Sequence, residues 1–375
     1  MRKIRVGVSV QINDKADSFW VNGIKQNAVT IVETFSLCSN VESCKLVNLG
    51  SLKDYNGTAW EPYRNNIIDF DKFIENFDVF VSVTASPTTE MIKKMREKGI
   101  KFVKHVMGNE YQIFSEYTVF DVEKTANSWN KKVDVDRVWI SPHIYEQNKD
   151  FLEVVSEAPA YIGPYVWSHK FIDEHVRLFK EKNGGTGLYQ PRKESTRRIS
   201  TFEPNINLLK TCITPVIIGE KMFMKEPELI DVFNIFGSSK IKEKKSFVDF
   251  ASSLNVCKAK KMFFESRYPI VWSLFEHTDI MLCHQRDLPL NYAYFDAAWL
   301  GFPVVHNADM VKDLGYYYDL WDADKAVEHL IDICKNFDSQ KDEYLKKSRE
   351  IISKYLPDHP DNINGYEELL EECLS

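Results

Sequence analysis

The sequence predicts an α/β protein with two doubly wound domains, each a parallel sheet covered by helices, and a helical C-terminus. The first observation is length, because 375 residues exceed one ordinary hydrophobic core and suit two domains. The second is that short apolar runs alternate with segments of helical period, as in parallel sheets wound by helices. The third is that this series ends near Pro164 and a new one begins at Arg198.

The segment between the two series has the composition of a connection. Gly163 and Pro164 end the first series, and Gly184–Gly187 is a glycine-rich turn shortly after it. The four expected parts are an N-terminal domain over 1–168, a connection over 169–190, a second domain over 191–350 and a C-terminal helical segment over 351–375. We expect the two domains to face each other across a cleft.

Six strands are expected in the first half. The first of them alternates charges and valines and then becomes apolar, as a first parallel strand does. Asn22 begins an amphipathic helix, and Ser86–Thr88 is a helix-start signal before Glu90–Lys98. The strands are Arg2–Val10, Lys45–Asn48, Asp78–Thr84, Lys101–Met107, Arg137–Ser141 and Ala160–Gly163.

The second half repeats this winding. We expect a helix from Asn207, and further helices from Ala323 onwards with a break at Pro357 and Pro360. The expected strands are Arg198–Phe202, Phe233–Phe236, Lys261–Phe264, Asp279–Cys283 and Phe302–His306.

Composition narrows the class of protein. A hydrophobic content of 44% with 13% aromatic residues is typical of a folded globular chain, and no apolar run reaches the roughly 18 residues of a membrane span. The chain begins directly with a strand and no cleavable signal, so we expect a cytoplasmic protein, or one in the host cytoplasm if a phage encodes it. The net charge of −7 gives no global attraction to nucleic acid, although local basic clusters permit a basic cleft. Seven widely spaced cysteines without a CxxC pair favour reduced thiols over disulfides or zinc.

The segment Leu282–Asn307 is the most informative part of the sequence. It reads as a strand end, a polar loop, a short helix that carries Asp296, a turn at Gly301 and another strand. That helix would begin at the carboxyl edge of a parallel sheet, where ligands of open α/β sheets bind. A carboxylate there can accept two hydrogen bonds from a ribose diol, so we assign Asp296 to the donor of a sugar-transferring enzyme. The alternative is an aspartate on a helix face, paired with a lysine.

Four polar residues precede Asp296 and are also expected to bind the donor. His284 and Arg286 follow a strand, where a cation suits a leaving nucleoside diphosphate. Asn291 and Tyr292 open the helix, with their polar groups toward phosphate or sugar. The alternatives are a satisfied loop arginine and a half-buried histidine.

A second donor segment follows the first strand of the second half. Glu203 and Asn205 lie in its loop, where Asn205 could cap the next helix and that helix N-terminus could bind a diphosphate. Lys210 could add a positive charge. The alternative is that Glu203 and Asn205 only cap the helix and that Lys210 is an ordinary surface lysine.

In the first half, two strand ends carry candidates for the acceptor side or the cleft. The first loop-to-helix junction holds Trp20, Asn22, Gly23 and Gln26, whose indole and amides suit sugar hydroxyls or a base. Asn22 could equally serve as a simple helix cap.

The second of these strand ends carries Asn109, Glu110 and Tyr111. An inverting transferase needs a group that takes the acceptor's proton, and Glu110 and His105 are the candidate catalytic residues. His105, inside the strand, could instead be simply buried.

Motifs for other cofactors are weak or missing. Three Asp-x-Asp strings occur, at Asp69/Asp71, Asp134/Asp136 and Asp322/Asp324, and none follows a strongly apolar strand, so chance explains them better than a metal site. A G-x-G-x-x-G fingerprint is missing after the first strand, which disfavours an NAD enzyme. We expect no cofactor and no essential metal, with the nucleotide sugar as a substrate.

Strings of residues along the whole chain carry a resemblance to a known family. The chain resembles, nearly end to end, a family of bacteria and phages labelled as a domain of unknown function, which is similar to GT-B glycosyltransferases. The strings are FWVNGIKQN (Phe19–Asn27), MGNEY (Met107–Tyr111), PYVWSHKF (Pro164–Phe171), FEPNINLLKT (Phe202–Thr211), LNYAYFDAAWLGFPVVHN (Leu290–Asn307) and GYYY (Gly315–Tyr318).

The resemblance implies two Rossmann-like domains in the GT-B arrangement and transfer of a hexose or pentose from a nucleoside diphosphate sugar, UDP-sugar being favoured. In many retaining GT-B enzymes two glutamates, eight residues apart, flank the donor loop. Here Asp296 and Leu288 stand at those positions, so retention and inversion both stay open. The acceptor is expected to be a glycan or a hydroxymethylated cytosine in DNA, since phages glycosylate such bases with GT-B enzymes. The alternative is a non-catalytic glycan- or nucleotide-binding protein of the same shape. Sugar, nucleotide and oligomeric state stay open.

Overall fold

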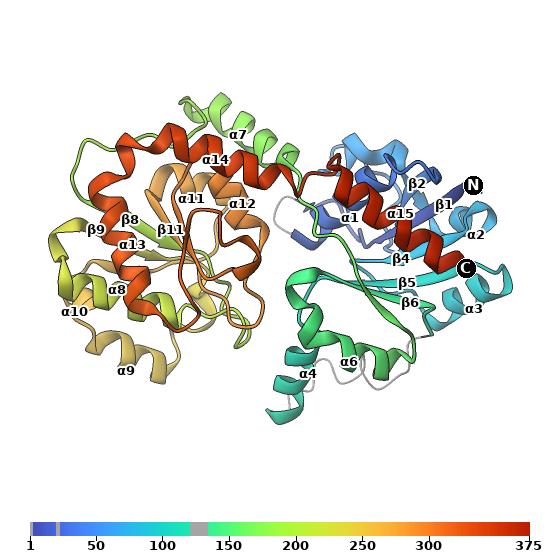
Figure 1. Ribbon diagram of the computed structural model, residues 1–375, viewed down its shortest axis with the longest axis horizontal. Coiled ribbons are helices and arrows are strands. Elements are labelled where there is room, and N and C mark those ends of the chain that lie inside the picture. The colour runs from blue at the N-terminus through green and yellow to red at the C-terminus, as the bar shows by residue number, and fades with distance from the viewer. Residues whose placement is uncertain (1–2, 20–22, 121–133) are drawn as a thin grey trace. The chain divides into compact units, whose positions relative to one another are not determined.

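The computed structural model describes residues 3–19, 23–120 and 134–375. The chain divides into two compact units, one formed by Met1–Ser168 together with Lys354–Ser375 and the other by His169–Ser353. Helix α7 (His169–Asn183) occupies most of the segment that the sequence suggests as a connection, and it belongs to the second unit. Residues 354–375 of the C-terminal segment belong to the first unit. The predicted α/β class with two wound sheets is confirmed (Figure 1).

The first unit is built on a seven-stranded parallel sheet in the order β3-β2-β1-β4-β5-β6-β7. Helices α1 and α15 pack against each other, so the end of the chain joins the first wound unit. The strands are β1 Ile4–Val10, β2 Val41–Asn48, β3 Ile67–Asp69, β4 Val79–Ser82, β5 Lys101–Val106, β6 Arg137–Ile140 and β7 Ala160–Ile162. The helices are α1 Gly23–Phe35, α2 Phe70–Asn76, α3 Thr89–Glu97, α4 Glu110–Val119, α6 Tyr145–Ser156 and α15 Pro360–Leu374, with 3-10 turns at Glu61–Asn66 and Pro142–Ile144.

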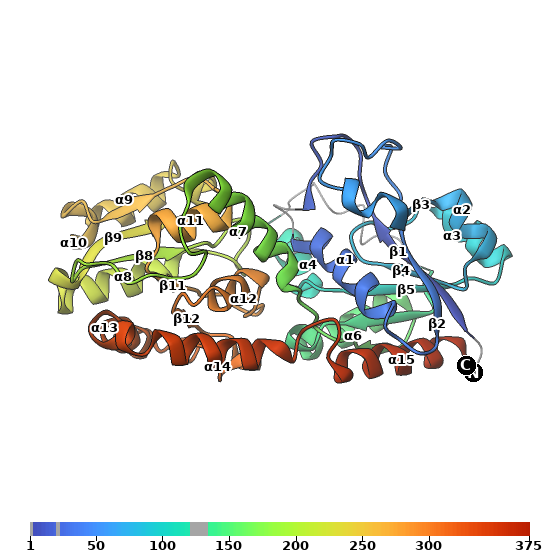
Figure 2. The same cartoon turned by 90° about the horizontal axis from the view of Figure 1, so that it is seen from above.

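A six-stranded parallel sheet in the order β10-β9-β8-β11-β12-β13 forms the second unit. Figure 2 shows α9 and α11 on one side of this sheet and α13 and α14 on the other. The strands are β8 Arg197–Thr201, β9 Ile230–Ile235, β10 Met262–Phe264, β11 Ile280–Leu282, β12 Val304–His306 and β13 Tyr316–Tyr317. The other helices are α8 Ile213–Lys225, α9 Lys245–Ser253, α10 Asn255–Lys258, α11 Ile270–His277, α12 Tyr292–Trp299, α13 Ala323–Asn336 and α14 Lys341–Ser353, with 3-10 turns at Pro227–Leu229, Ser238–Lys240, Asp309–Val311 and Phe337–Ser339.

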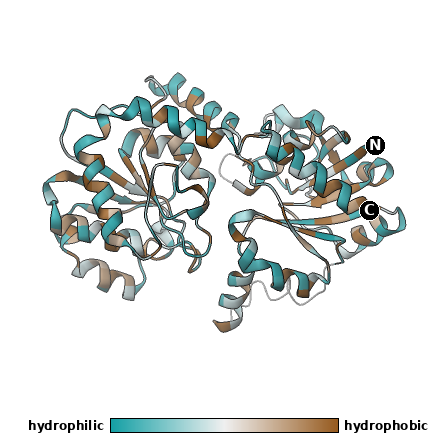
Figure 3. Cartoon of the chain, in the orientation of Figure 1, coloured by the Kyte–Doolittle hydropathy of each residue, from teal (hydrophilic) through white to brown (hydrophobic). Residues whose placement is uncertain are grey.

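Hydrophobic residues concentrate on the strands of both sheets (Figure 3). Strands of a wound sheet are buried on both faces, and β4, β11 and β12 have every residue buried. None of the described helices is long and apolar enough to cross a bilayer. All seven cysteines are free thiols.

Strand order fixes the place in each sheet where ligands can bind. In the second sheet β8 lies between β9 and β11, and the direction of winding reverses between β8 and β11. The loops that leave the carboxyl ends of two such strands diverge and open a crevice at that point. We therefore expect the residues that follow β8 and β11 to form the ligand site of this unit.

Candidate functional site

Glu203 and Gln285 meet at this switch point, although 82 positions separate them in the chain. Glu203 follows β8 by two residues and is 2% exposed, and Gln285 follows β11 and is fully buried. Gln285 Nε2 donates a hydrogen bond of 2.9 Å to Glu203 Oε2. Burial raises the pKa of Glu203 to about 7, against the charge of Lys210 and the hydrogen bonds from Gln285 and the His284 backbone, which lower it. Near neutral pH this carboxyl group can therefore hold or release a proton.

Lys210 is half-buried and lies near the same carboxyl group. Burial lowers the pKa of its ammonium group, the charge of Glu203 raises it, and the charge of Arg267 lowers it further. Burial would not lower the pKa of an ordinary surface lysine in this way, so the position of Lys210 does not fit the alternative of a solvated surface lysine. Lys210 therefore lies within reach of two charges, the carboxyl group of Glu203 and the guanidinium group of Arg267.

Asn205 has a different place from the one predicted. The helix expected from Asn207 begins only at Ile213, so Asn205 is not its N-cap, and the prediction was wrong. Asn205 lies in a loop with a φ of 53°. Its amide nitrogen donates to the Glu203 carbonyl at 2.8 Å, and its Oδ1 accepts from the backbone N–H of Cys212 at 2.8 Å. The side chain therefore holds the loop in shape, because its polar atoms are used within the protein.

His284 lies under the same edge of the sheet and is buried. Its Nδ1 is 3.0 Å from the hydroxyl of Tyr318, which also lies 2.9 Å from the Cys283 carbonyl. Burial lowers the pKa of His284 to about 4. The ring is therefore neutral at neutral pH, and it does not supply the positive charge that the sequence suggested for this loop.

Arg286 provides a cation at the rim. Its backbone N–H donates to the Leu209 carbonyl at 3.0 Å, which joins the loop after β11 to the loop after β8. The guanidinium group lies 3.3 Å from Asp287 and 5.6 Å from the ring centroid of Trp321. Trp321 is 71% exposed and is not among the residues predicted from the sequence. Its only signal in the sequence is a tryptophan just after the tyrosine-rich string that ends at Tyr318.

Helix α12 begins at this edge because it links β11 to β12 of a parallel sheet. Asn291 is its N-cap, and the side chain accepts a hydrogen bond of 2.8 Å from the Ala293 backbone N–H. Tyr292 is buried, whereas Asp296 keeps partial exposure one turn further along. Gly301 has a φ of 87°, and this left-handed turn ends the helix and leads into β12.

Three predicted residues of the first unit, Asn109, Glu110 and Tyr111, follow the carboxyl end of β5. Asn109 is the N-cap of α4 and accepts from the Gln112 N–H at 3.0 Å. Glu110 forms an ion pair of 2.6 Å with Lys104, and Tyr111 is 47% exposed.

His105 is 3% exposed, and its Nε2 is 3.1 Å from the hydroxyl of Tyr366. Burial lowers the pKa of His105 to about 3. Packed in this way among aromatic rings, it suits the core better than proton transfer to an acceptor.

The junction before α1 is described only in part. Trp20 and Asn22 lie outside the described residues. Gly23 is the first residue of α1, and Gln26 donates from Nε2 to the Phe19 carbonyl at 3.2 Å. Gln26 thus links Phe19 to helix α1.

Most of the Asp-x-Asp carboxylates contact the protein itself. Within the described part of the chain, no three His, Cys, Asp or Glu side chains are grouped so that they could hold a metal ion. Asp69 pairs with Lys53, Asp134 and Asp136 pair with Arg96, Asp322 caps α13, and Asp324 pairs with Lys221.

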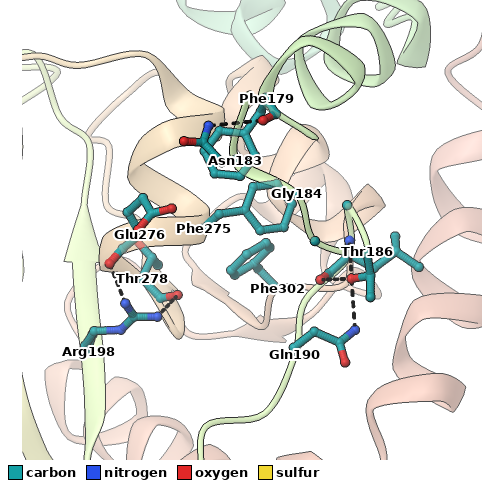
Figure 4. Close-up of a pocket in the computed structure, with 13 residues that line it drawn as sticks. Phe179, Asn183, Gly184, Thr186, Gln190, Arg198, Phe275, Glu276, Thr278 and Phe302 are labelled. Carbon is teal, nitrogen blue, oxygen red and sulfur yellow. Dashed lines mark hydrogen bonds between the residues drawn. The ribbon is translucent and has the colours of Figure 1, made fainter. Parts of the chain in front are cut away.

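A cavity of about 240 Å³ lies at the opposite, amino-terminal edge of the second sheet. Figure 4 shows the rings of Phe179, Phe275 and Phe302 around it. Arg198 also lines it, but its guanidinium group is already paired with Asp279 at 2.8 Å. This cavity is not formed by the residues predicted for the donor.

A model of a family of proteins of unknown function, DUF2827, matches residues 6–370. The protein belongs to this family. No curated protein matches the sequence.

Solved structures share the fold of this DUF2827 member at low identity. An O-GlcNAc transferase from Thermobaculum terrenum has a TM-score of 0.57 at 9% identity, over 99% of this chain and 68% of that one. HepE from Anabaena, solved with UDP and glucose, has a TM-score of 0.53 at 10% identity, over 99% of each chain. The N-terminal domain of a trehalose-6-phosphate phosphatase from Candida albicans has a TM-score of 0.56 at 10% identity, over 99% and 96%. The architecture is thus that of GT-B glycosyltransferases, as predicted.

Proposed function

We propose that the protein is a glycosyltransferase that takes a sugar from a nucleoside diphosphate sugar, with a UDP-sugar favoured, and passes it to a hydroxyl group. The observation that supports the proposal is the meeting of the loops after β8 and β11 at one switch point, where the Arg286 backbone N–H donates to the carbonyl of Leu209, the neighbour of Lys210. Asp296 lies on α12, the helix that follows the second of these loops. The shared fold with an O-GlcNAc transferase and with HepE supports it. An acid for a diol and two cations for a diphosphate are the groups that such a donor needs.

Each part of the donor has a partner in this proposal. The carboxylate of Asp296 accepts hydrogen bonds from the ribose hydroxyls. The N-terminus of α12 and the cations Lys210 and Arg286 bind the diphosphate and stabilise the negative charge that grows on it as it leaves. Because these cations lie on the protein, we propose that transfer needs no metal ion, so EDTA should leave the rate unchanged.

We propose a glycan or a hydroxymethylated cytosine in DNA as the acceptor, since both offer a hydroxyl group. A base in duplex DNA would have to leave the stack before it could react. Glu110 is proposed to take the acceptor's proton. His105, buried against Tyr366, is left out of the mechanism.

Asp296→Ala tests the donor site. We expect wild-type protein to bind UDP in calorimetry and the variant to bind it at least tenfold more weakly, because two charge-assisted hydrogen bonds are lost. Asp342→Ala is the matched control, since this aspartate lies on α14 of the same unit with its side chain 88% exposed. The control should bind UDP as the wild type does.

Radiolabelled UDP-sugars then separate enzyme from binding protein. Label transferred to a glycan or to hydroxymethylcytosine DNA identifies the acceptor. UDP binding without transfer or hydrolysis of any donor would support the non-catalytic alternative.

A further inference from the structure

A short chain of hydrogen bonds runs beneath the proposed donor site. The Tyr318 hydroxyl lies 2.9 Å from the Cys283 carbonyl oxygen and 3.0 Å from His284 Nδ1. Tyr318 is 1% exposed and follows β13, while Cys283 and His284 follow β11. Both contacts therefore lie in the protein interior, where an unsatisfied polar contact is costly.

The donor and acceptor capacities of these three groups determine which atom carries each proton. A carbonyl oxygen can only accept, and a tyrosine hydroxyl has one proton to give. Both contacts are hydrogen bonds in one arrangement alone, in which Tyr318 donates to Cys283 and His284 Nδ1–H donates to Tyr318. In any other arrangement two lone pairs face each other at about 3 Å in one of these contacts.

The second ring nitrogen then has a defined character. His284 is neutral at neutral pH because burial lowers its pKa to about 4. With its single proton on Nδ1, Nε2 presents a lone pair. No described residue forms a hydrogen bond with Nε2, and the atom is not one of the fully buried polar atoms without a partner. Nε2 therefore reaches solvent at the end of β11.

We propose that His284 Nε2 accepts a hydrogen bond from a hydroxyl group of the donor's sugar, and that Tyr318 is the positioning residue that holds the ring in this accepting tautomer. The proposal rests on the proposed function, since it names the part of the donor that His284 contacts. Ionised phosphate oxygens are also acceptors, so a diphosphate opposite Nε2 would have no proton to share. The diphosphate therefore belongs to Lys210 and Arg286, and the sugar belongs to His284.

The tautomer can be measured without any ligand. In full-length protein labelled with 15N-histidine, the nitrogen chemical shifts distinguish a protonated from an unprotonated ring nitrogen, and the His284→Ala spectrum identifies the signal. We expect His284 to carry its proton on Nδ1 at neutral pH. A proton on Nε2 in the wild type would overturn the proposal. Tyr318→Phe should move the proton toward Nε2, because the acceptor for Nδ1–H is gone.

Calorimetry with UDP and with UDP-glucose tests the contact itself. His284→Ala should weaken UDP-glucose binding by roughly tenfold, the worth of one hydrogen bond, and change UDP binding less than twofold. His284→Gln should restore part of the difference, because its Oε1 can accept in place of Nε2. Tyr318→Phe should reproduce the selective loss without touching the ligand.

The outcomes separate this inference from the proposed function. If His284→Ala weakens UDP and UDP-glucose equally, or neither, the sugar contact is refuted while the donor site stands. If wild-type protein binds no nucleotide, the proposed function and the sugar contact both fail. The measured tautomer still decides the hydrogen-bond chain in that case.

Discussion

Glu203→Gln offers the sharpest test of the buried cluster at the carboxyl edge of the second sheet. Burial raises the pKa of Glu203 from 4.5 to about 7. Between these values the unfolded chain has lost the proton while the folded protein still holds it. The folded state binds more protons there, so the free energy of unfolding falls as pH rises through this window.

The size of this effect follows from the shift. The pKa of Glu203 is higher by about 2.5 in the folded protein than in the unfolded chain, and a difference of one in pKa corresponds to about 1.4 kcal/mol. The free energy of unfolding of the wild type should therefore fall by about 3 kcal/mol between a pH below 4.5 and a pH above 7. Glutamine keeps the shape and an acceptor for Gln285 but does not titrate. The stability of Glu203→Gln relative to wild type should therefore rise by about 3 kcal/mol between pH 4.5 and 8.

Urea unfolding followed by tryptophan fluorescence at several pH values measures this difference. The subtraction removes every other titrating group that the two proteins share. Glu276→Gln, at an exposed position of the same unit, is the control and should vary by less than about 0.5 kcal/mol. A difference between Glu203→Gln and wild type that stays constant with pH would refute the reasoning that burial governs this carboxyl group.

The remaining predictions concern single contacts. Asn291→Ala removes the cap of α12 and should lower the free energy of unfolding by about 1 kcal/mol in urea titrations; no change would show that the cap is dispensable. Burial lowers the pKa of His105 to about 3, so the unfolded chain binds a proton at this residue before the folded protein does as the pH falls below 6.5. The free energy of unfolding of the wild type therefore decreases in acid, and His105→Gln should reduce this decrease. Equal acid sensitivity in variant and wild type would contradict this. Arg286→Ala should weaken UDP binding about tenfold, and less so in high salt, whereas unchanged calorimetric affinity would remove it from the diphosphate site.

Periodicity revealed most of the fold, and its failures have physical causes. Strands buried on both faces read as apolar runs, which made β4, β11 and β12 visible in the sequence. Two strands were missed, β3 (Ile67–Asp69) and β13 (Tyr316–Tyr317). Both are edge strands of two or three residues, too short to show alternation.

The candidate site was predictable where its residues follow strands. Glu203 and His284 follow β8 and β11, so a parallel sheet brings them to one edge. Tyr318, Arg267 and Trp321 were missed because their contacts join segments far apart in the chain. The protonation state of His284 could not be predicted from the sequence either, because the burial that keeps this ring neutral exists only in the folded protein.

A crystal structure of the protein with bound UDP tests the central claim most directly. We predict that the ribose hydroxyls lie within hydrogen-bond distance of the Asp296 carboxylate and that the diphosphate lies beside Lys210 and Arg286. UDP bound elsewhere, for example in the cavity lined by Phe275 and Phe302 at the opposite edge of the sheet, would contradict the proposed donor site.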